Sequence, residues 1–166
     1  YSALSLLAVW WLLPSGPAAA AQTGKEPRIA WSLPMLLVTA SYGLFGFGYV
    51  ITGTFLVTIA RMDAAGPMVE FLCWFIAGLT ASVALFAWKP FVRPLGLGWV
   101  YVAALLIEAV GVLATVLLPH SVAPLIGGAL FGATFLAITA YGLQIGRKLS
   151  PASPRRILAT MTAAFG

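Results

Sequence analysis

Four long stretches of the 166-residue chain carry almost no charge, and this feature constrains the fold more than any other. A helix needs about 20 apolar residues to cross the roughly 30 Å hydrocarbon core of a bilayer. The uncharged stretches have that length, and strict apolar–polar alternation typical of membrane strands is absent. The sequence therefore predicts an all-α integral membrane protein with four complete transmembrane helices, over about 34–60, 67–88, 95–118 and 123–146.

Two shorter apolar segments flank these four spans. Residues 1–13 are typical of the end of a helix, 14–32 form a loop, and another helix begins at about 156. The chain opens without Met, and Gly166 lies inside an apolar pattern that carries no capping signal. We therefore expect a piece of a longer protein, with residues 33–166 forming part of a helix bundle.

Composition agrees with a lipid environment and argues against nucleic acid. Hydrophobic residues make up 61% of the chain and charged residues 8%, whereas a soluble domain carries about 25% charge. The net charge of +5 comes from basic residues in the short connectors, and nucleic acid binding needs them gathered on one solvated face. We expect the lipid bilayer to be the principal partner.

The basic residues are distributed asymmetrically between the two ends of the spans. Threading the four spans alternately places eight on one side, against Arg61 alone on the other: Lys25, Arg28, Lys89, Arg93, Arg147, Lys148, Arg155 and Arg156. By the positive-inside rule, segments 14–32, 89–94 and 147–156 are cytoplasmic, as in an inner-membrane protein. The stretch ending in AAAAQ resembles a signal-peptide cleavage site, but a cleaved leader would invert this bias and the basic leading segment is missing.

Small residues recur at helical spacing in the first and fourth spans. The first span carries a stripe with a seven-residue repeat, which predicts close packing against another helix: Thr39, Gly46, Gly53 and Ala60. Its dense glycines, Gly43, Gly46 and Gly48, allow two interpretations, tight packing or local unwinding that exposes backbone to a substrate. The fourth span has two GxxxG matches, Gly128 to Gly132 and Gly142 to Gly146, which indicate packing only.

Glu108 is the one acidic residue well inside a span. A charged group there costs at least about 2.5 kcal/mol, so the side chain should face protein or water. Small or hydroxyl-bearing residues share its helical face: Tyr101, Ala104, Gly111 and Thr115. Two roles stay open, an ion-coupling or proton-carrying carboxyl, and a hydrogen-bonding group between helices.

The remaining polar residues give weaker signals. Hydroxyl groups within spans one and four are candidates for lining a solute pathway: Tyr42, Tyr49, Thr134 and Thr139. Glu70 is expected to be a solvated helix start, and Cys73 a small packing residue. His120 has no Cys, Asp or Glu beside it, so neither a metal nor another cofactor is expected. No nucleophile with a base and orienting acid is present, and an enzymatic role has no support.

Three segments carry a family resemblance: YGLFGFGYVITGTFLVTIAR, GGALFGATFLAITAYGLQIGRKLSP and RRILATMTAAFG. In this order and spacing they resemble the C-terminal half of a YbfB/YjiJ-type transporter of the major facilitator superfamily. The resemblance implies that residues 1–13 end the sixth helix, the four full spans are the seventh to tenth, and the eleventh starts near 156. It also implies that the seventh and tenth helices face a central cavity, whereas Glu108 lies on the usually peripheral ninth.

The resemblance further implies a superfamily motif between the second and third spans. The segment WKPFVRPLGLG keeps Lys89, Arg93 and glycines but lacks the acidic residue of that motif. The leading hypothesis is part of a secondary active transporter that moves an unknown small solute by alternating access, completed by the N-terminal half and remaining helices. The alternative is a small polytopic membrane scaffold or assembly subunit without transport activity.

Overall fold

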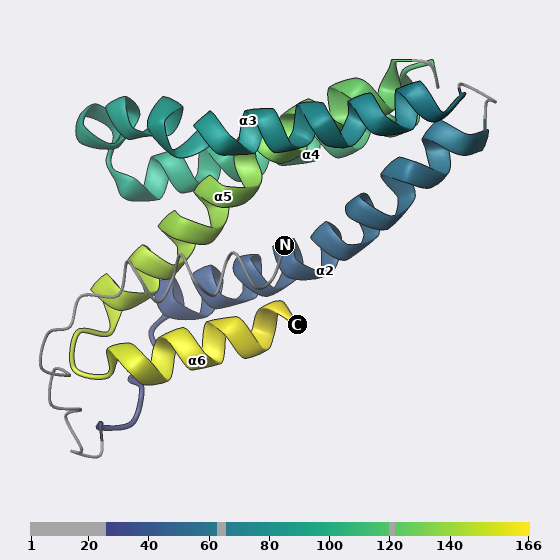
Figure 1. Ribbon diagram of the computed structural model, residues 1–166. Coiled ribbons are helices and arrows are strands. Elements are labelled where there is room, and N and C mark those ends of the chain that lie inside the picture. Colours follow the sequence, from purple (N-terminus) through teal and green to yellow (C-terminus); the bar gives the residue numbers. More distant parts are fainter. Residues whose placement is uncertain (1–25, 63–65, 120–121) are drawn as a thin grey trace, which may run out of the picture.

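The computed structural model describes residues 26–62, 66–119 and 122–166, which form helices joined by short connections (Figure 1). In chain order the helices are α2 (Leu33–Met62), α3 (Gly66–Leu95), α4 (Leu97–Leu117), α5 (Ala123–Leu149) and α6 (Pro154–Phe165). The described ranges contain no strand, and the predicted all-helical fold is confirmed. The expected helix end at 1–13, most of the following loop, and His120 lie outside the described residues.

Four of these helices, α2 to α5, are long and apolar enough to cross a bilayer. Their outer surfaces carry large apolar side chains, and Leu44, Phe86 and Val116 are each more than 70% exposed. Contiguous apolar surface of this extent is unfavourable in water but matches hydrocarbon. The structure therefore confirms the four predicted membrane-spanning helices.

α5 is the central helix of the bundle. Half of the residues in its most apolar stretch are buried, against 17% in the corresponding stretch of α3. It packs against α3 and α4 along one part of its length and against α2 and α6 along the other (Figure 1). Small residues on α5 let these neighbours approach closely, and the buried glycines are Gly127, Gly128, Gly132, Gly142 and Gly146.

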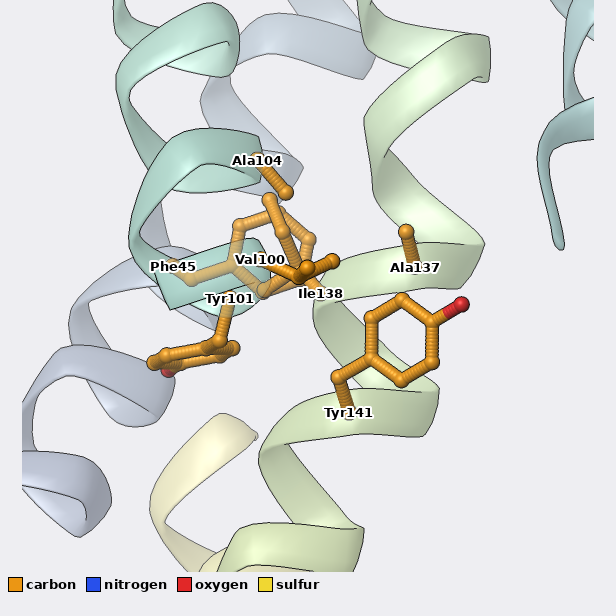
Figure 2. Close-up of a cluster of buried hydrophobic side chains, with 7 residues drawn as sticks. All are labelled: Phe45, Val100, Tyr101, Ala104, Ala137, Ile138 and Tyr141. Carbon is orange, nitrogen blue, oxygen red and sulfur yellow. The ribbon is translucent and has the colours of Figure 1, made fainter. Parts of the chain in front are cut away.

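The larger core cluster lies where α2, α4 and α5 meet (Figure 2). Val100, Tyr101 and Ala104 of α4 pack with Ala137, Ile138 and Tyr141 of α5, and Phe45 enters from α2. The α4 residues recur at positions i, i+1 and i+4, so they share one helical face. This cluster fixes α4 against α5, and its residue Ala104 lies one helical turn before Glu108.

A second cluster joins α6 to α2. Ile157 and Met161 lie four residues apart on α6 and are fully buried against Met35 and Tyr42. The opposite side of α6 is exposed, so this helix is amphipathic, unlike the other four. α6 begins at Pro154, two residues before the predicted start, because proline is favoured in the first turn of a helix.

The predicted break at residue 88 was wrong, because α3 continues through Pro90 and Pro94 to Leu95. Pro90 has no backbone N–H, so it cannot donate a hydrogen bond to the carbonyl oxygen of Phe86. The side chain of Phe86 faces outward and is 77% exposed. Trp88 holds this part of α3 on α5, because its Nε1–H donates a hydrogen bond to the carbonyl oxygen of Ala133 at 2.8 Å. Membrane helices accommodate prolines where neighbouring helices hold the segment in place.

The turn from α3 to α4 consists of one residue, Gly96. Its φ of 83° lies in the left-handed region, which favours glycine, and its N–H donates to the carbonyl of Val92 at 3.1 Å. The expected 89–94 connector is therefore helical. Because the turn is so short, α3 and α4 run back against each other (Figure 1).

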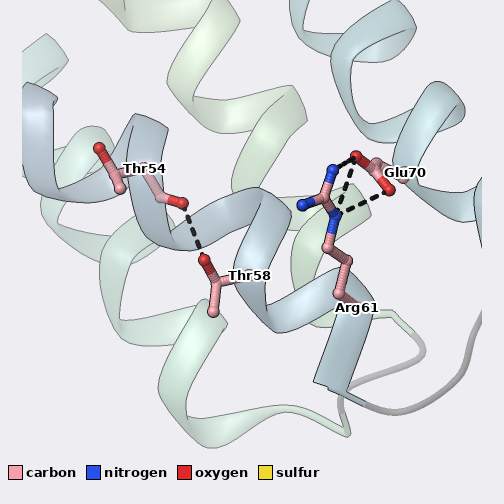
Figure 3. Close-up of polar contacts among 4 residues, drawn as sticks. All are labelled: Thr54, Thr58, Arg61 and Glu70. Carbon is pink, nitrogen blue, oxygen red and sulfur yellow. Dashed lines mark hydrogen bonds and ion pairs between the residues drawn. The ribbon is translucent and has the colours of Figure 1, made fainter.

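The two ends of the bundle differ in their charged groups. The segment preceding α2, the α3–α4 turn and the α5–α6 connection lie at one end, whereas α2 ends and α3 begins at the other (Figure 1). At the latter end Arg61 Nη2 and Glu70 Oε1 are 2.6 Å apart (Figure 3). Glu70, predicted to be a solvated helix start, thus pairs with the last turn of α2.

Candidate functional site

Glu108 lies in the interior of the bundle, midway along α4. Its side chain is 8% exposed, and Tyr101, Ala104 and Gly111 on the same face are also buried. α4 packs closely on α5 at Gly111, since an added Cβ there would lie 3.0 Å from the Cβ of Leu130. The sequence placed Glu108 on the inner face of its helix, and the structure confirms this.

The partner of Glu108 is Thr134 on α5, which is fully buried. Thr134 Oγ1 is within hydrogen-bonding reach of Glu108 Oε2, and also lies 2.8 Å from the carbonyl oxygen of Leu130. A threonine hydroxyl carries one hydrogen, so it cannot donate fully to both acceptors. The protonation of Glu108 decides how the hydrogen bonds are shared.

Two arrangements of these groups differ by one proton. With Glu108 ionised, Thr134 donates to the carboxylate. With Glu108 protonated, the carboxylic acid donates to Thr134 Oγ1, and the Thr134 hydroxyl donates to the carbonyl of Leu130 in its own helix. The second arrangement is a continuous chain of two hydrogen bonds. The two arrangements differ by one proton and by the rotation of one hydroxyl, and neither requires movement of a helix.

A cavity of about 280 Å³ lies beside Glu108, between α2 and α4. Its polar lining consists of Glu108 and three hydroxyl-bearing residues of α2: Ser41, Tyr49 and Thr52. Within the described part of the chain Glu108 makes no ion pair, and only its Oε2 accepts a hydrogen bond. The other carboxyl oxygen is thus available to a group that enters the cavity.

Tyr49 connects this cavity to a group of aromatic rings. Its ring stacks on Phe135 at a centroid distance of 4.8 Å, and on Phe131 and Phe165 at 5.7 and 5.8 Å. These rings come from α2, α5 and α6, so three helices meet here. Tyr49 therefore lines the Glu108 cavity, while its ring is held by apolar contacts.

Tyr42 and Thr139 lie at a separate contact between α2 and α5. Tyr42 is 3% exposed and packs on the ring of Phe165 at 5.3 Å. Its hydroxyl faces Thr139, whose buried Oγ1 makes no hydrogen bond of standard geometry among the described residues. Of the four predicted pathway residues, the structure brings Tyr49 and Thr134 to Glu108 and leaves Tyr42 and Thr139 apart from it.

The predicted packing glycines have different surroundings. A Cβ on Gly46 would collide with the backbone oxygen of Phe165, and one on Gly132 with the backbone oxygen of Ala77. Gly128 is buried in α5. An added Cβ on Gly53 would meet no atom within 4 Å in the described part of the chain, so no close packing is seen there. α2 is a continuous helix through its glycines, and the unwinding interpretation is wrong for this structure.

Two polar contacts near the site were missed from the sequence. Ser41 Oγ and Tyr101 Oη are 3.0 Å apart and join α2 to α4 beside the cavity that Ser41 lines. Trp88 holds the end of α3 on α5. Tyr101 was recognised only as sharing a face with Glu108. No local pattern identifies Ser41, because its partner lies 60 residues away.

The other potentially reactive groups have structural surroundings. Cys73 is fully buried, and its thiol donates to the carbonyl of Pro124 at 3.2 Å. Residues 26–62, 66–119 and 122–166 contain no group of three His, Cys, Asp or Glu side chains that would hold a metal. In the part of the chain that the structure describes, the polar groups at the site are the Glu108 carboxyl and the hydroxyls of Ser41, Tyr49, Thr52 and Thr134.

Long apolar helices with exposed apolar side chains, and the buried carboxyl of Glu108, define a polytopic α-helical membrane protein. The sequence matches the family described as Uncharacterised MFS-type transporter YbfB over residues 1–166. The chain thus belongs to this family of the major facilitator superfamily, as its resemblance indicated. No curated protein and no solved structure matches the sequence significantly.

Proposed function

We propose that this chain forms part of a secondary active transporter that moves a small solute across the inner membrane by alternating access. Its membership of a transporter family supports this proposal. The observation that carries it is the buried Glu108 carboxyl, held by Thr134 beside an open and mostly apolar cavity that Ser41, Tyr49 and Thr52 also line. Ionisable groups at such positions in membrane proteins commonly mark solute, ion or proton pathways.

In this proposal Glu108 carries the coupling proton. The two hydrogen-bond arrangements with Thr134 give the carboxyl a stable partner in both protonation states. A solute or another helix that approaches the free carboxyl oxygen from the cavity would favour one state over the other. Transport of the solute would then be linked to proton movement, because each ligand changes the affinity for the other.

The rest of the transporter is supplied by other helices of the same protein. Alternating access requires two bundles around a central site, and the helices described here belong to one. The basic end, with Arg28, Arg147 and Arg156, is cytoplasmic in this proposal because positive charges are retained on that side. The identity of the solute depends on groups from both bundles.

The test uses the full protein reconstituted in liposomes. A thermal-shift screen with amino acids, sugars, organic acids and amines identifies a stabilising solute, and its labelled form is then followed with and without a proton gradient. We expect gradient-dependent uptake in the wild type. The E108Q variant should lose the dependence on the gradient but retain solute exchange, and E70Q, at the exposed ion pair, should behave as wild type.

Two results would contradict parts of the proposal. Unchanged proton dependence in E108Q would leave Glu108 with only a hydrogen-bonding role between α4 and α5. Absence of any stabilising solute and of uptake, together with stoichiometric association with another membrane protein, would reject transport and favour the scaffold function.

A further inference from the structure

A hollow at the basic end of the bundle is lined by two arginines from distant parts of the chain. Its volume is about 580 Å³, and it lies between the segment preceding α2 and the first turns of α6. Arg28 and Trp31 come from the first segment, and Arg156 and Thr160 from α6. Ile29 and Ala159 add apolar surface to the same hollow.

The carboxylate of Glu26 is bonded to groups at the N-terminus of α6. Glu26 accepts hydrogen bonds from the backbone N–H groups of Arg155 and Arg156, at 3.1 and 3.0 Å. It also lies 3.8 Å from Nε of Arg155. The side chains of Arg28 and Arg156 form no ion pair within the described ranges. The hollow is therefore positively charged, and Glu26 already occupies the N-terminus of α6.

The hollow adjoins the start of the apolar span of α2, where a membrane-spanning helix meets the lipid headgroups. The span begins at Leu33, which is 69% exposed, and Trp31 just before it is half exposed. Tryptophan is enriched at the membrane–water interface, where its ring contacts the glycerol and carbonyl region of lipids. Basic pockets between transmembrane helices at this level bind anionic headgroups.

We propose that this hollow binds the phosphate group of an anionic phospholipid between Arg28 and Arg156, with the lipid glycerol against Trp31. Guanidinium groups suit a phosphate diester because their planar N–H groups donate in pairs to its oxygens. The apolar surface of Ile29 and Ala159 favours a lipid over a free anion, since inorganic phosphate gains nothing from it. The bound lipid would hold the segment before α2 against α6.

The experiment measures lipid binding to the full protein in detergent by native mass spectrometry and thermal shift. The probes are dioleoylphosphatidylglycerol, dioleoylphosphatidylcholine and inorganic phosphate. We expect the wild type to retain and be stabilised by phosphatidylglycerol only. The R28Q/R156Q variant should bind this lipid about 30-fold more weakly, from the contribution of two basic residues near an anionic lipid.

The matched control is K89Q/R93Q, which removes two positive charges from the same end of the bundle but outside the hollow. This control variant should bind phosphatidylglycerol and be stabilised by it as strongly as the wild type. An equal loss in both double variants would show a general attraction to the basic end and overturn the proposal. Equal stabilisation by inorganic phosphate would show a free-anion site and overturn it as well.

A conservative pair keeps the proposal testable if R28Q/R156Q does not fold. R28K/R156K preserves the charge but removes the paired N–H donors, so it should bind phosphatidylglycerol more weakly than wild type. Binding by this variant at full wild-type strength would contradict recognition by the guanidinium groups. The readout is lipid binding, so the result does not depend on whether the protein transports a solute.

Discussion

The carboxylate of Glu26 accepts a hydrogen bond from the backbone N–H of Arg156, 130 residues later in the chain, at 3.0 Å. Helix N-termini carry unpaired N–H groups, and a side chain just before the helix commonly bonds them. Ser153 at the N-cap position of α6 makes no such bond. The capping group is supplied by the segment that precedes α2, so this segment is bonded directly to α6.

Removing this cap should loosen α6. We expect E26A to lower the free energy of unfolding by about 1 kcal/mol, as for the loss of other helix caps. Hydrogen exchange should become faster at the amides of Arg155 and Arg156. E70A is the control, because the Arg61–Glu70 pair is exposed and lies at the other end of the bundle from the N-terminus of α6. Unchanged exchange in α6 of E26A would show that the cap contributes nothing.

Gly132 and Gly53 should respond differently to the same substitution. G132A places a methyl group against the backbone oxygen of Ala77, which cannot move without shifting α3. Such overpacking costs about 1–3 kcal/mol. G53A meets no neighbour within 4 Å in the described residues, and alanine favours a helix over glycine by about 1 kcal/mol. We therefore expect G53A to be neutral or stabilising.

Unfolding of both glycine variants in mixed detergent micelles checks this contrast. A loss in G53A as large as in G132A would show that another helix of the full protein packs on that face of α2. Equal stability of G132A and the wild type would mean that α3 and α5 adjust their separation without cost.

The Glu108–Thr134 bond should give a measurable coupling energy. In a double-mutant cycle of E108M and T134V we expect a coupling of about 0.6 kcal/mol, the average for hydrogen bonds between membrane helices, and at most about 1.7 kcal/mol. Methionine is used because the amide of glutamine would still bond Thr134. The control cycle pairs E108M with T115V. The Thr115 hydroxyl bonds the carbonyl of Val112 in its own helix, so this cycle should show no coupling. Equal couplings in the two cycles would mean that the energy does not come from the interhelix bond.

Trp88 should stabilise the part of α3 that contains the prolines. W88F removes the donor to the carbonyl of Ala133, and we expect a loss of about 0.5–1.5 kcal/mol. W99F is the control, because Trp99 is 72% exposed on the outer surface of α4. Tryptophan fluorescence during unfolding measures both variants. If W99F lost as much stability as W88F, the indole bond to α5 would not be the cause.

Part of the candidate site could be predicted from the sequence. The position of Glu108 on an inward face follows from the helical spacing of its small neighbours and from the cost of placing a carboxylate in lipid. The same reasoning gave Thr134 only as one of several hydroxyls along a pathway. Its pairing with Glu108 depends on the register between α4 and α5, which no local pattern records.

The helix bounds and the packing glycines also depend on contacts between helices that the local sequence does not reveal. The end of α3 was placed at residue 88 because proline interrupts isolated helices, yet Trp88 bonds to α5 and the helix continues. Gly46 and Gly53 occupy equivalent positions of a seven-residue repeat, and only Gly46 has a close neighbour in the described residues. Periodicity identifies a face of a helix, but the partner of that face is decided elsewhere in the chain.

The sequence by itself determined that the chain is a set of membrane helices with basic residues gathered at one end. Both properties follow from the transfer energies of single side chains between water and hydrocarbon, which depend on composition and local order. Only the tertiary structure decided that Thr134 holds Glu108, that Glu26 caps α6, and that Arg28 and Arg156 share one hollow. These groups are far apart in the chain and come together only when the helices pack.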